Sequence, residues 1–100
     1  MRKPYIVFGY NSYTNYYSLN NEIDKKEFLE KLRISPFKSL LNFIYIEDKG
    51  KVTYLYDIFN GLNFENLNKL YNYYDKDTLA PIIMELKLKN REWLLWENHI

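Results

Sequence analysis

Two runs of β-branched and aromatic residues flank a polar tetrapeptide in the stretch from Asn42 to Phe59. The tetrapeptide, Asp48-Lys49-Gly50-Lys51, is typical of a β-hairpin turn in which glycine supplies the residue with positive φ. If Glu47 lies opposite Lys51 with Gly50 as a bulge, alternation along the strands defines two faces. One face then carries Ile44, Ile46, Val52 and Tyr54, and the other carries Phe43, Tyr45, Thr53 and Leu55. Both faces are apolar, so the first suits a core and the second needs a different cover.

The N-terminal part of the chain contains a further apolar run, Tyr5 to Tyr10. Nearly every position in it is apolar, which predicts a strand in the centre of a sheet. Turn-forming residues follow at 11–15. Residues 16–19 then either return as the second strand of a hairpin or belong to an ordered, tyrosine-rich loop, and the pattern leaves both alternatives open.

A first helix is predicted before the hairpin. Asp24 and Glu27 have the spacing of a capping box, so the helix should begin near Lys25. Its apolar stripe consists of Phe28, Leu29 and Leu32. Residues 35–36, a serine followed by proline, predict a short second helical turn that runs to residue 40 or 41.

A second helix is predicted after the hairpin. Asn63 has the character of an N-cap, and the helix should extend from Phe64 to about Tyr74, where residues 75–78 end it. The apolar side is formed by Leu67, Leu70, Tyr71 and Tyr74.

The last quarter of the chain fits two patterns. Met84, Leu86 and Leu88 alternate with charged residues, which is strand periodicity, and residues 90–91 could turn the chain into a final strand at 93–97. A helical stripe fits equally well in spacing, and Pro81 is tolerable in a first turn. Its members are Leu79, Ile82, Ile83, Leu86, Asn90, Trp93 and Leu94. We favour the hairpin because the charge alternation is regular and the end of the chain is rich in aromatic residues.

The elements add up to one α+β domain over residues 1–100. We expect an antiparallel sheet of four to six strands with two helices packed on one face. The order of strands and helices resembles a ferredoxin-like arrangement, although order alone implies no activity.

Composition narrows the class of protein. Apolar residues make up 47% and charged residues 27% of the 100, which is typical of a globular chain. No cysteine is present and the net charge is +1, so disulfides, thiol catalysis and a general attraction to nucleic acid or acidic lipid are disfavoured. We expect a soluble, intracellular protein that does not enter a membrane. The abundance of tyrosine, asparagine, lysine and isoleucine follows AT-rich codons and suggests a virus or mobile element, which would place the protein in the host cytoplasm.

Catalytic chemistry is not predicted. The single histidine, His99, lies next to the C-terminus, where chains fray. Asp75 and Asp77 could hold Mg²⁺, but two acids that cap and punctuate a turn are the better interpretation. Asp57 is likewise interpreted as a turn-capping acid. We therefore expect no enzyme, no catalytic residue, no metal and no cofactor.

Binding is the function that the sequence favours. An apolar second sheet face in a small domain suggests contact with a second copy, as a homodimer, or with another protein. The interface candidates are Phe43, Tyr45, Leu55, Tyr13, Tyr16, Trp93 and Trp96. The alternative is a nucleic-acid-binding accessory protein that stacks bases on its aromatic rings. The candidates for that role are Tyr45, Lys38, Lys49, Lys51, Lys87, Lys89 and Arg91.

Overall fold

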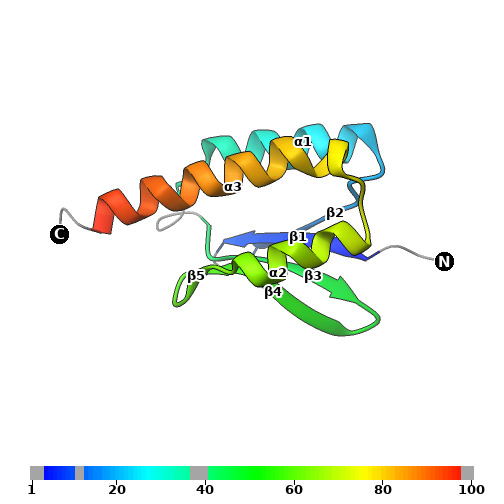
Figure 1. The fold of residues 1–100 in the computed structure, drawn as a ribbon, viewed down its shortest axis with the longest axis horizontal. Helices are drawn as coiled ribbons and strands as arrows, with labels where there is room; N and C mark the ends of the chain where they lie inside the picture. Colours follow the sequence, from blue (N-terminus) through cyan, green and yellow to red (C-terminus); the bar gives the residue numbers. More distant parts are fainter. Residues whose placement is uncertain (1–3, 11–12, 37–40, 98–100) are drawn as a thin grey trace.

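Five antiparallel strands form one sheet, and the helices lie on a single face of it (Figure 1). The computed structural model describes residues 4–10, 13–36 and 41–97. The strands are β1 (Tyr5–Tyr10), β2 (Tyr13–Tyr17), β3 (Phe43–Asp48), β4 (Lys51–Asp57) and β5 (Gly61–Leu62). The helices are α1 (Glu22–Ile34), α2 (Phe64–Lys69), the 3₁₀ helix η1 (Leu70–Asn72) and α3 (Lys76–Glu97). The predicted α+β class and antiparallel sheet are confirmed, with three α-helices in the described part of the chain instead of two.

The strand order is β2-β1-β3-β4-β5, with every neighbouring pair antiparallel. The central position predicted for the first strand is confirmed, because β1 lies between β2 and β3. The alternative of a second strand in the tyrosine-rich segment is confirmed, but this strand, β2, covers residues 13–17 instead of 16–19, so residues 13–15 belong to the strand and not to a turn. A ferredoxin-like order is not confirmed. That arrangement has one strand before its first helix and a final strand after its second, whereas here two strands, β1 and β2, precede α1 and the described part of the chain ends in α3.

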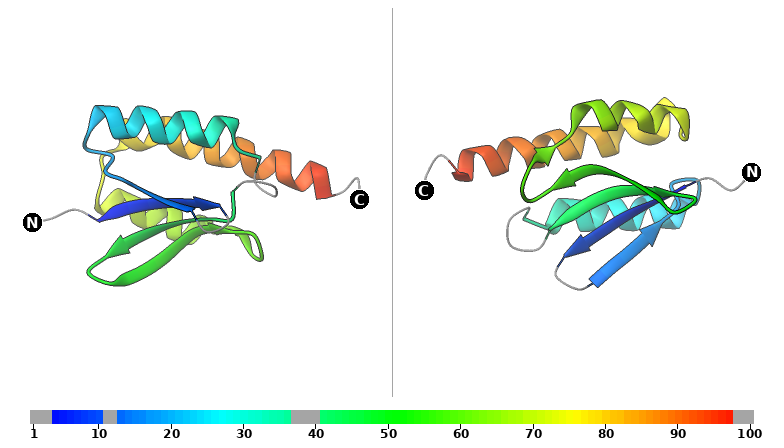
Figure 2. Two further views of the ribbon diagram at one scale, coloured as in Figure 1. Left: turned by 180° about the vertical axis from the view of Figure 1, so that it is seen from behind. Right: turned by 90° about the horizontal axis from the view of Figure 1, so that it is seen from below.

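The core lies between the sheet and the helices. Ile6 and Phe8 of β1 and Ile44 of β3 meet Phe28 and Leu32 of α1, and all five are fully buried. Helices α1 and α3 lie side by side over this face, and α2 covers it beside β4 and β5 (Figures 1 and 2). The other members of the core include Leu67 of α2, Leu70 of η1 and the α3 residues Leu79, Ile82 and Leu86.

The hairpin between β3 and β4 differs from the predicted register by one residue. Asp48 pairs with Lys51, and Glu47 pairs with Val52 instead of Lys51. Lys49 and Gly50 form a two-residue turn with φ values of 51° and 80°, as a type I′ turn requires. A slip of one residue exchanges the faces of a strand. Val52 and Tyr54 therefore lie on the face opposite the core, and Thr53 lies on the core side.

Leu55 is the second correction in this hairpin. The register shifts between Ile44 and Tyr45, so that Ile44 pairs with Tyr56 and Tyr45 pairs with Tyr54. Leu55 is the extra residue of this bulge. Its side chain is 1% exposed and belongs to the core, so it is not available at an interface.

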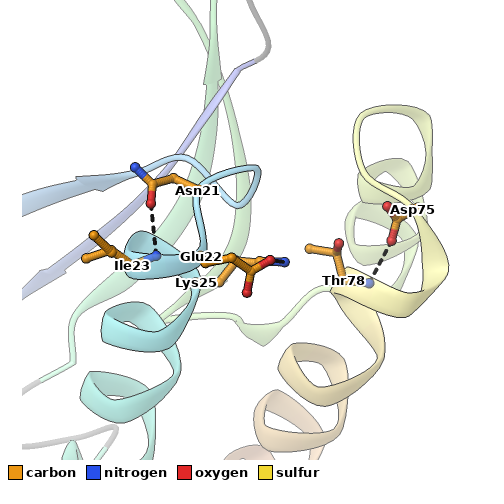
Figure 3. A network of polar contacts seen from close by, with 6 residues as sticks. All are labelled: Asn21, Glu22, Ile23, Lys25, Asp75 and Thr78. Carbon is orange, nitrogen blue, oxygen red and sulfur yellow. Dashed lines mark hydrogen bonds and ion pairs between the residues drawn. The ribbon is translucent and has the colours of Figure 1, made fainter.

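Helix α1 begins earlier than predicted. Asn21 is the N-cap, and its side chain accepts a hydrogen bond of 2.9 Å from the N–H of Ile23. The Asp24–Glu27 pair therefore lies inside the helix, and Ile23 is exposed. Figure 3 shows this cap opposite the start of α3, where the Asp75 carboxylate accepts a hydrogen bond of 2.7 Å from the N–H of Thr78. The turn predicted through residue 40 or 41 includes residues 37–40, which lie outside the described residues.

Helix α2 begins where the sequence predicts it. The Asn63 side chain accepts a hydrogen bond of 2.9 Å from the N–H of Asn66, which confirms the N-cap. The helix changes to 3₁₀ geometry at Leu70, so the regular α-helix is shorter than expected. Leu70 and Tyr74 are buried as predicted, whereas Tyr71 is 45% exposed.

The hairpin favoured for the last quarter is wrong. Residues 76–97 form one helix, α3. Its buried side chains, Leu79, Ile82 and Leu86, follow the helical stripe, while Met84 and Leu88 are 63% and 53% exposed. Alternation over six residues fits either structure, and packing of the stripe against the sheet and α1 decides for the helix. No helix in the described part of the chain has the length and apolar character needed to cross a membrane.

Candidate functional site

The face of the sheet opposite the helices carries half of the aromatic residues of the strands. Its central row crosses four strands. Val7 of β1 pairs with Tyr16 of β2 on one side and with Tyr45 of β3 on the other, and Tyr45 pairs with Tyr54 of β4. Paired residues share one face of a sheet. We call this surface the outer face.

Two further rows complete the outer face. On one side of the central row, Tyr5 of β1 pairs with Glu47 of β3, which pairs with Val52 of β4. On the other side, Gly9 of β1 pairs with Phe43 of β3. The outer face therefore has five aromatic residues on four strands.

The absence of a side chain at Gly9 lets the Phe43 ring lie over the backbone of β1. A Cβ atom built on Gly9 would lie 2.1 Å from Cζ of Phe43, well inside van der Waals contact. The Phe43 ring therefore occupies the space above Gly9. It also stacks on Tyr45, with 5.3 Å between ring centroids and an interplanar angle of 30°.

The tyrosines of the outer face contact one another at steep angles. Tyr45 and Tyr54 meet edge to face at 5.4 Å between centroids, and Tyr5 and Tyr16 do so at 6.4 Å. Edge-to-face pairs at these distances are favourable because of the ring quadrupoles. The rings of β1 and β2 thus contact each other, and so do those of β3 and β4.

No helix in the described part of the chain covers the outer face. Figure 2, right, shows the sheet from this side with α1 behind it. Tyr16 is 55%, Tyr54 46% and Val52 44% exposed, although Val7 beneath them is fully buried. The larger side chains of the outer face thus cover Val7, and they are themselves exposed and available for contact with another molecule.

A hollow of about 720 Å³ borders the outer face at the end nearest the β3–β4 turn. Tyr5 and Tyr16 form one part of its lining, and Glu47, Asp48 and Lys49 form another. Two aromatic rings and the Glu47 side chain beside one open space can receive a cationic group, through cation–π contact and ion pairing.

The hydroxyl of Tyr45 lies in the same neighbourhood. Burial raises its pKa, and nearby Tyr16 and the negative charge of Glu47 raise it further. Tyr45 therefore stays protonated and can donate a hydrogen bond at neutral pH.

The structure separates the predicted interface residues. Phe43, Tyr45 and Tyr16 lie together on the outer face. Tyr13 is 66% exposed but lies on the other face of β2, beside Tyr10. Trp93 packs against the margin of the core, with Cζ3 at 3.7 Å from a Cβ position built on Gly61. The side chain of Trp96 lies outside the described residues.

The predicted nucleic-acid residues are not brought together. Lys49 alone of the described basic candidates borders the outer face. Lys51 pairs with Asp48 and lines a small hollow on the helix side with Lys69. The three remaining described candidates, Lys87, Lys89 and Arg91, belong to α3 in the opposite layer. Lys38 lies outside the described residues.

Two of the three acidic candidates, Asp57 and Asp75, have structural roles. The Asp57 carboxylate accepts hydrogen bonds from the N–H groups of Phe59 and Asn60 at 2.8 and 2.7 Å, which confirms the turn-capping interpretation. Asp75 caps α3, and Asp77 is exposed in the first turn of that helix. Within the described ranges, no three His, Asp or Glu side chains form a group that could hold a metal ion. His99 lies outside those ranges.

Tyr5 and Tyr54 are members of the outer face that sequence reasoning missed. The predicted turn assigns Tyr54 to the core side, because its register differs from the observed one by one residue. The apolar run at residues 5–10 gives no sign that Tyr5 faces away from the core. Tyr5, Val7 and Gly9 alternate with Ile6 and Phe8 along the strand. Together with the strand pairing, this alternation is the signal that assigns Tyr5 to the outer face.

Comparison of the chain with protein-family models, with curated proteins and with solved structures finds no match. The outer face is therefore interpreted from its own chemistry.

Proposed function

We propose that this chain is a non-catalytic binding protein whose outer face contacts another protein. The observation that carries the proposal is a row of exposed and half-buried tyrosines on a sheet face that no described helix covers. Tyrosine and phenylalanine are enriched at protein interfaces because they bury a large area with little loss of side-chain entropy.

The charge around the outer face favours a protein over a nucleic acid. Phosphate binding normally needs a segregated basic patch beside the stacking rings. Here Glu47 lies within the outer face, and Lys49 is the one described basic candidate at its border. A carboxylate in that position repels a phosphate backbone and attracts a basic side chain.

The hollow lined by Tyr5, Tyr16 and Glu47 specifies the partner further. A lysine or arginine side chain of the bound protein would fit there, with its stem on the tyrosine rings and its charge near Glu47. Apolar residues of the partner would cover Tyr45 and Tyr54.

A peptide-display selection tests the proposal. The wild-type protein should enrich peptides that contain a basic residue next to apolar residues, and Tyr45→Ser and Glu47→Gln should each weaken their binding at least about tenfold. Tyr71→Ser is the matched control, because Tyr71 is as exposed as Tyr54, at 45% against 46%, but lies in the helix layer. Its peptide binding should equal that of the wild type.

Two outcomes contradict the proposal. Selected peptides that bind Tyr45→Ser and the wild type equally would remove the outer face as their site. Labelled single- or double-stranded oligonucleotides that bind in a salt-sensitive manner, and that depend on Tyr45, would replace the protein partner with a nucleic acid.

A further inference from the structure

The free edge of β2 has an unusual composition. Its five residues, Tyr-Thr-Asn-Tyr-Tyr, include no charged residue, no proline and no glycine. Sheet edges are normally protected from pairing with other chains by charges, proline, bulges or a covering element. β2 pairs with β1 in continuous register from residue 13 to residue 17, with no bulge. None of the usual protective features is present within β2.

The backbone of β2 presents hydrogen-bonding groups along this edge. The carbonyl oxygen of Gly9 accepts a hydrogen bond of 2.8 Å from the N–H of Asn42, so Gly9 directs its backbone groups toward β3. These groups alternate along a strand, and residues 6, 8 and 10 therefore direct theirs toward β2, where they pair with residues 17, 15 and 13. The backbone groups of Thr14 and Tyr16 consequently point away from the sheet.

The opposite edge of the sheet is protected. The carbonyl oxygen of Tyr54 accepts a hydrogen bond of 2.7 Å from the Asn66 side chain, and that of Leu55 accepts one of 2.8 Å from the N–H of Asn63. β5 pairs with the end of β4, and the charged residue Lys51 lies at the start of β4. The edge of β4 is thus occupied from Tyr54 to Asp57, whereas no strand in the described residues pairs with the outer side of β2.

We infer that two copies of this chain pair through β2, antiparallel about a two-fold axis at Asn15, to form one continuous ten-stranded sheet. In this register the outward backbone groups of Thr14 meet those of Tyr16 of the partner subunit, and the reverse pair forms as well. A two-fold axis brings identical residues of the two copies close together. Because β2 carries no charged residue, this approach causes no repulsion between like charges.

The exposed rings of β2 also gain partners in this register. Tyr13, 66% exposed, lies opposite Tyr17 of the partner subunit, and Tyr16, 55% exposed, lies opposite Thr14 of the partner subunit. Tyr16 belongs to the outer face, so the outer faces of the two copies become continuous. Paired strands of this length bury less than the roughly 1,200 Å² of a standard interface, and the dimer is therefore reversible and concentration-dependent.

Sedimentation velocity from micromolar to millimolar concentration tests the inference, with two edge-proline variants. Thr14→Pro removes an outward N–H without breaking the β1 ladder and should remain monomeric while the wild type dimerises. Val52→Pro is the matched control, because Val52 directs its backbone groups outward at the opposite edge, and it should dimerise like the wild type. A strictly monomeric wild type, or equal dimerisation of Thr14→Pro and the wild type, would overturn the inference.

A thiol placed on the axis tests the register separately, even if Thr14→Pro does not fold. The chain contains no cysteine, so Asn15→Cys introduces its only thiol. Directly opposed residues of a non-hydrogen-bonded pair have Cα atoms about 4.5 Å apart, within the range for a disulfide. Mild oxidation should cross-link Asn15→Cys and leave Tyr13→Cys monomeric, because residues 13 of the two copies would be about 14 Å apart along the strand. Equal cross-linking of both variants would contradict this register.

These outcomes are independent of the proposed protein partner. Thr14→Pro changes self-association and leaves the peptide contacts of Tyr45 intact, whereas Tyr45→Ser changes peptide binding and leaves the edge of β2 intact. Either proposal can therefore fail while the other stands.

Discussion

Gly9 and Phe43 illustrate how a single residue shapes the outer face. The Phe43 ring lies where a side chain at residue 9 would be, and it stacks on Tyr45. A glycine in the middle of a strand weakens β-structure on its own. Its presence here is explained by the ring that covers it.

Gly9→Ala should therefore destabilise the protein by about 1–3 kcal/mol, because the new methyl group displaces the Phe43 ring from its position on the sheet. The measurement is a double-mutant cycle in urea with Phe43→Ala. In the Phe43→Ala background, Gly9→Ala should cost markedly less, since nothing remains above residue 9 to be displaced. Equal costs in both backgrounds would show that the ring is not the cause.

In the β3–β4 hairpin, the length of the turn determines which residues of β4 lie on the outer face and which face the core. A two-residue turn at Lys49 and Gly50 places Val52 and Tyr54 beside Glu47 and Tyr45 on the outer face. The three-residue alternative with a bulge would have placed them in the core. Lys49 accepts a positive φ in this turn, which is unfavourable for most residues with a Cβ atom.

Lys49→Asn should stabilise the hairpin by about 0.5–1 kcal/mol, because asparagine tolerates the left-handed region and Asn-Gly is the preferred type I′ sequence. Thermal or urea unfolding measures the gain. Lys51→Asn provides the control, since Lys51 lies in β4 and should gain nothing from the change. A loss of stability in Lys49→Asn would argue against a type I′ turn.

At the scale of the whole molecule, residues far apart in the chain are joined at the start of β1. The hydroxyl of Tyr74, at the end of the α2–η1 segment, donates a hydrogen bond to the carbonyl oxygen of Pro4. Burial raises the pKa of Tyr74, and burial also raises the pKa of Tyr17. Both tyrosines belong to the core cluster.

Stability should fall as the pH rises above about 10. A tyrosine whose pKa is raised in the folded state keeps its proton after the unfolded chain has lost it, so deprotonation favours unfolding by up to about 1.4 kcal/mol per pH unit for each proton. Urea unfolding between pH 8 and pH 11 measures this slope. Tyr74→Phe should have lower stability at neutral pH but a shallower decline above pH 10.

Tyr71→Phe, an exposed site in the same segment, is the control for that series and should keep the wild-type slope. If Tyr74→Phe also kept it, the buried hydroxyl would not contribute to the alkaline loss of stability.

The sequence by itself determined those features that depend only on residues close together along the chain. The apolar run of β1, the Asn63 cap of α2 and the turn at Gly50 were all predicted, because alternation, capping and positive φ are local properties. The α+β class follows from these elements. The presence of Phe43, Tyr45 and Tyr16 on an exposed surface was also anticipated.

Only the tertiary structure decided the features that depend on what packs against a segment. Residues 84–89 alternate well enough for a strand, and burial of Leu79, Ile82 and Leu86 against the sheet and α1 made them helical. Strand pairing brought Tyr5 and Tyr54 to the outer face and left β2 at an open edge. Each of these outcomes requires contacts between residues distant in the chain, and local patterns do not encode which distant partner will be present.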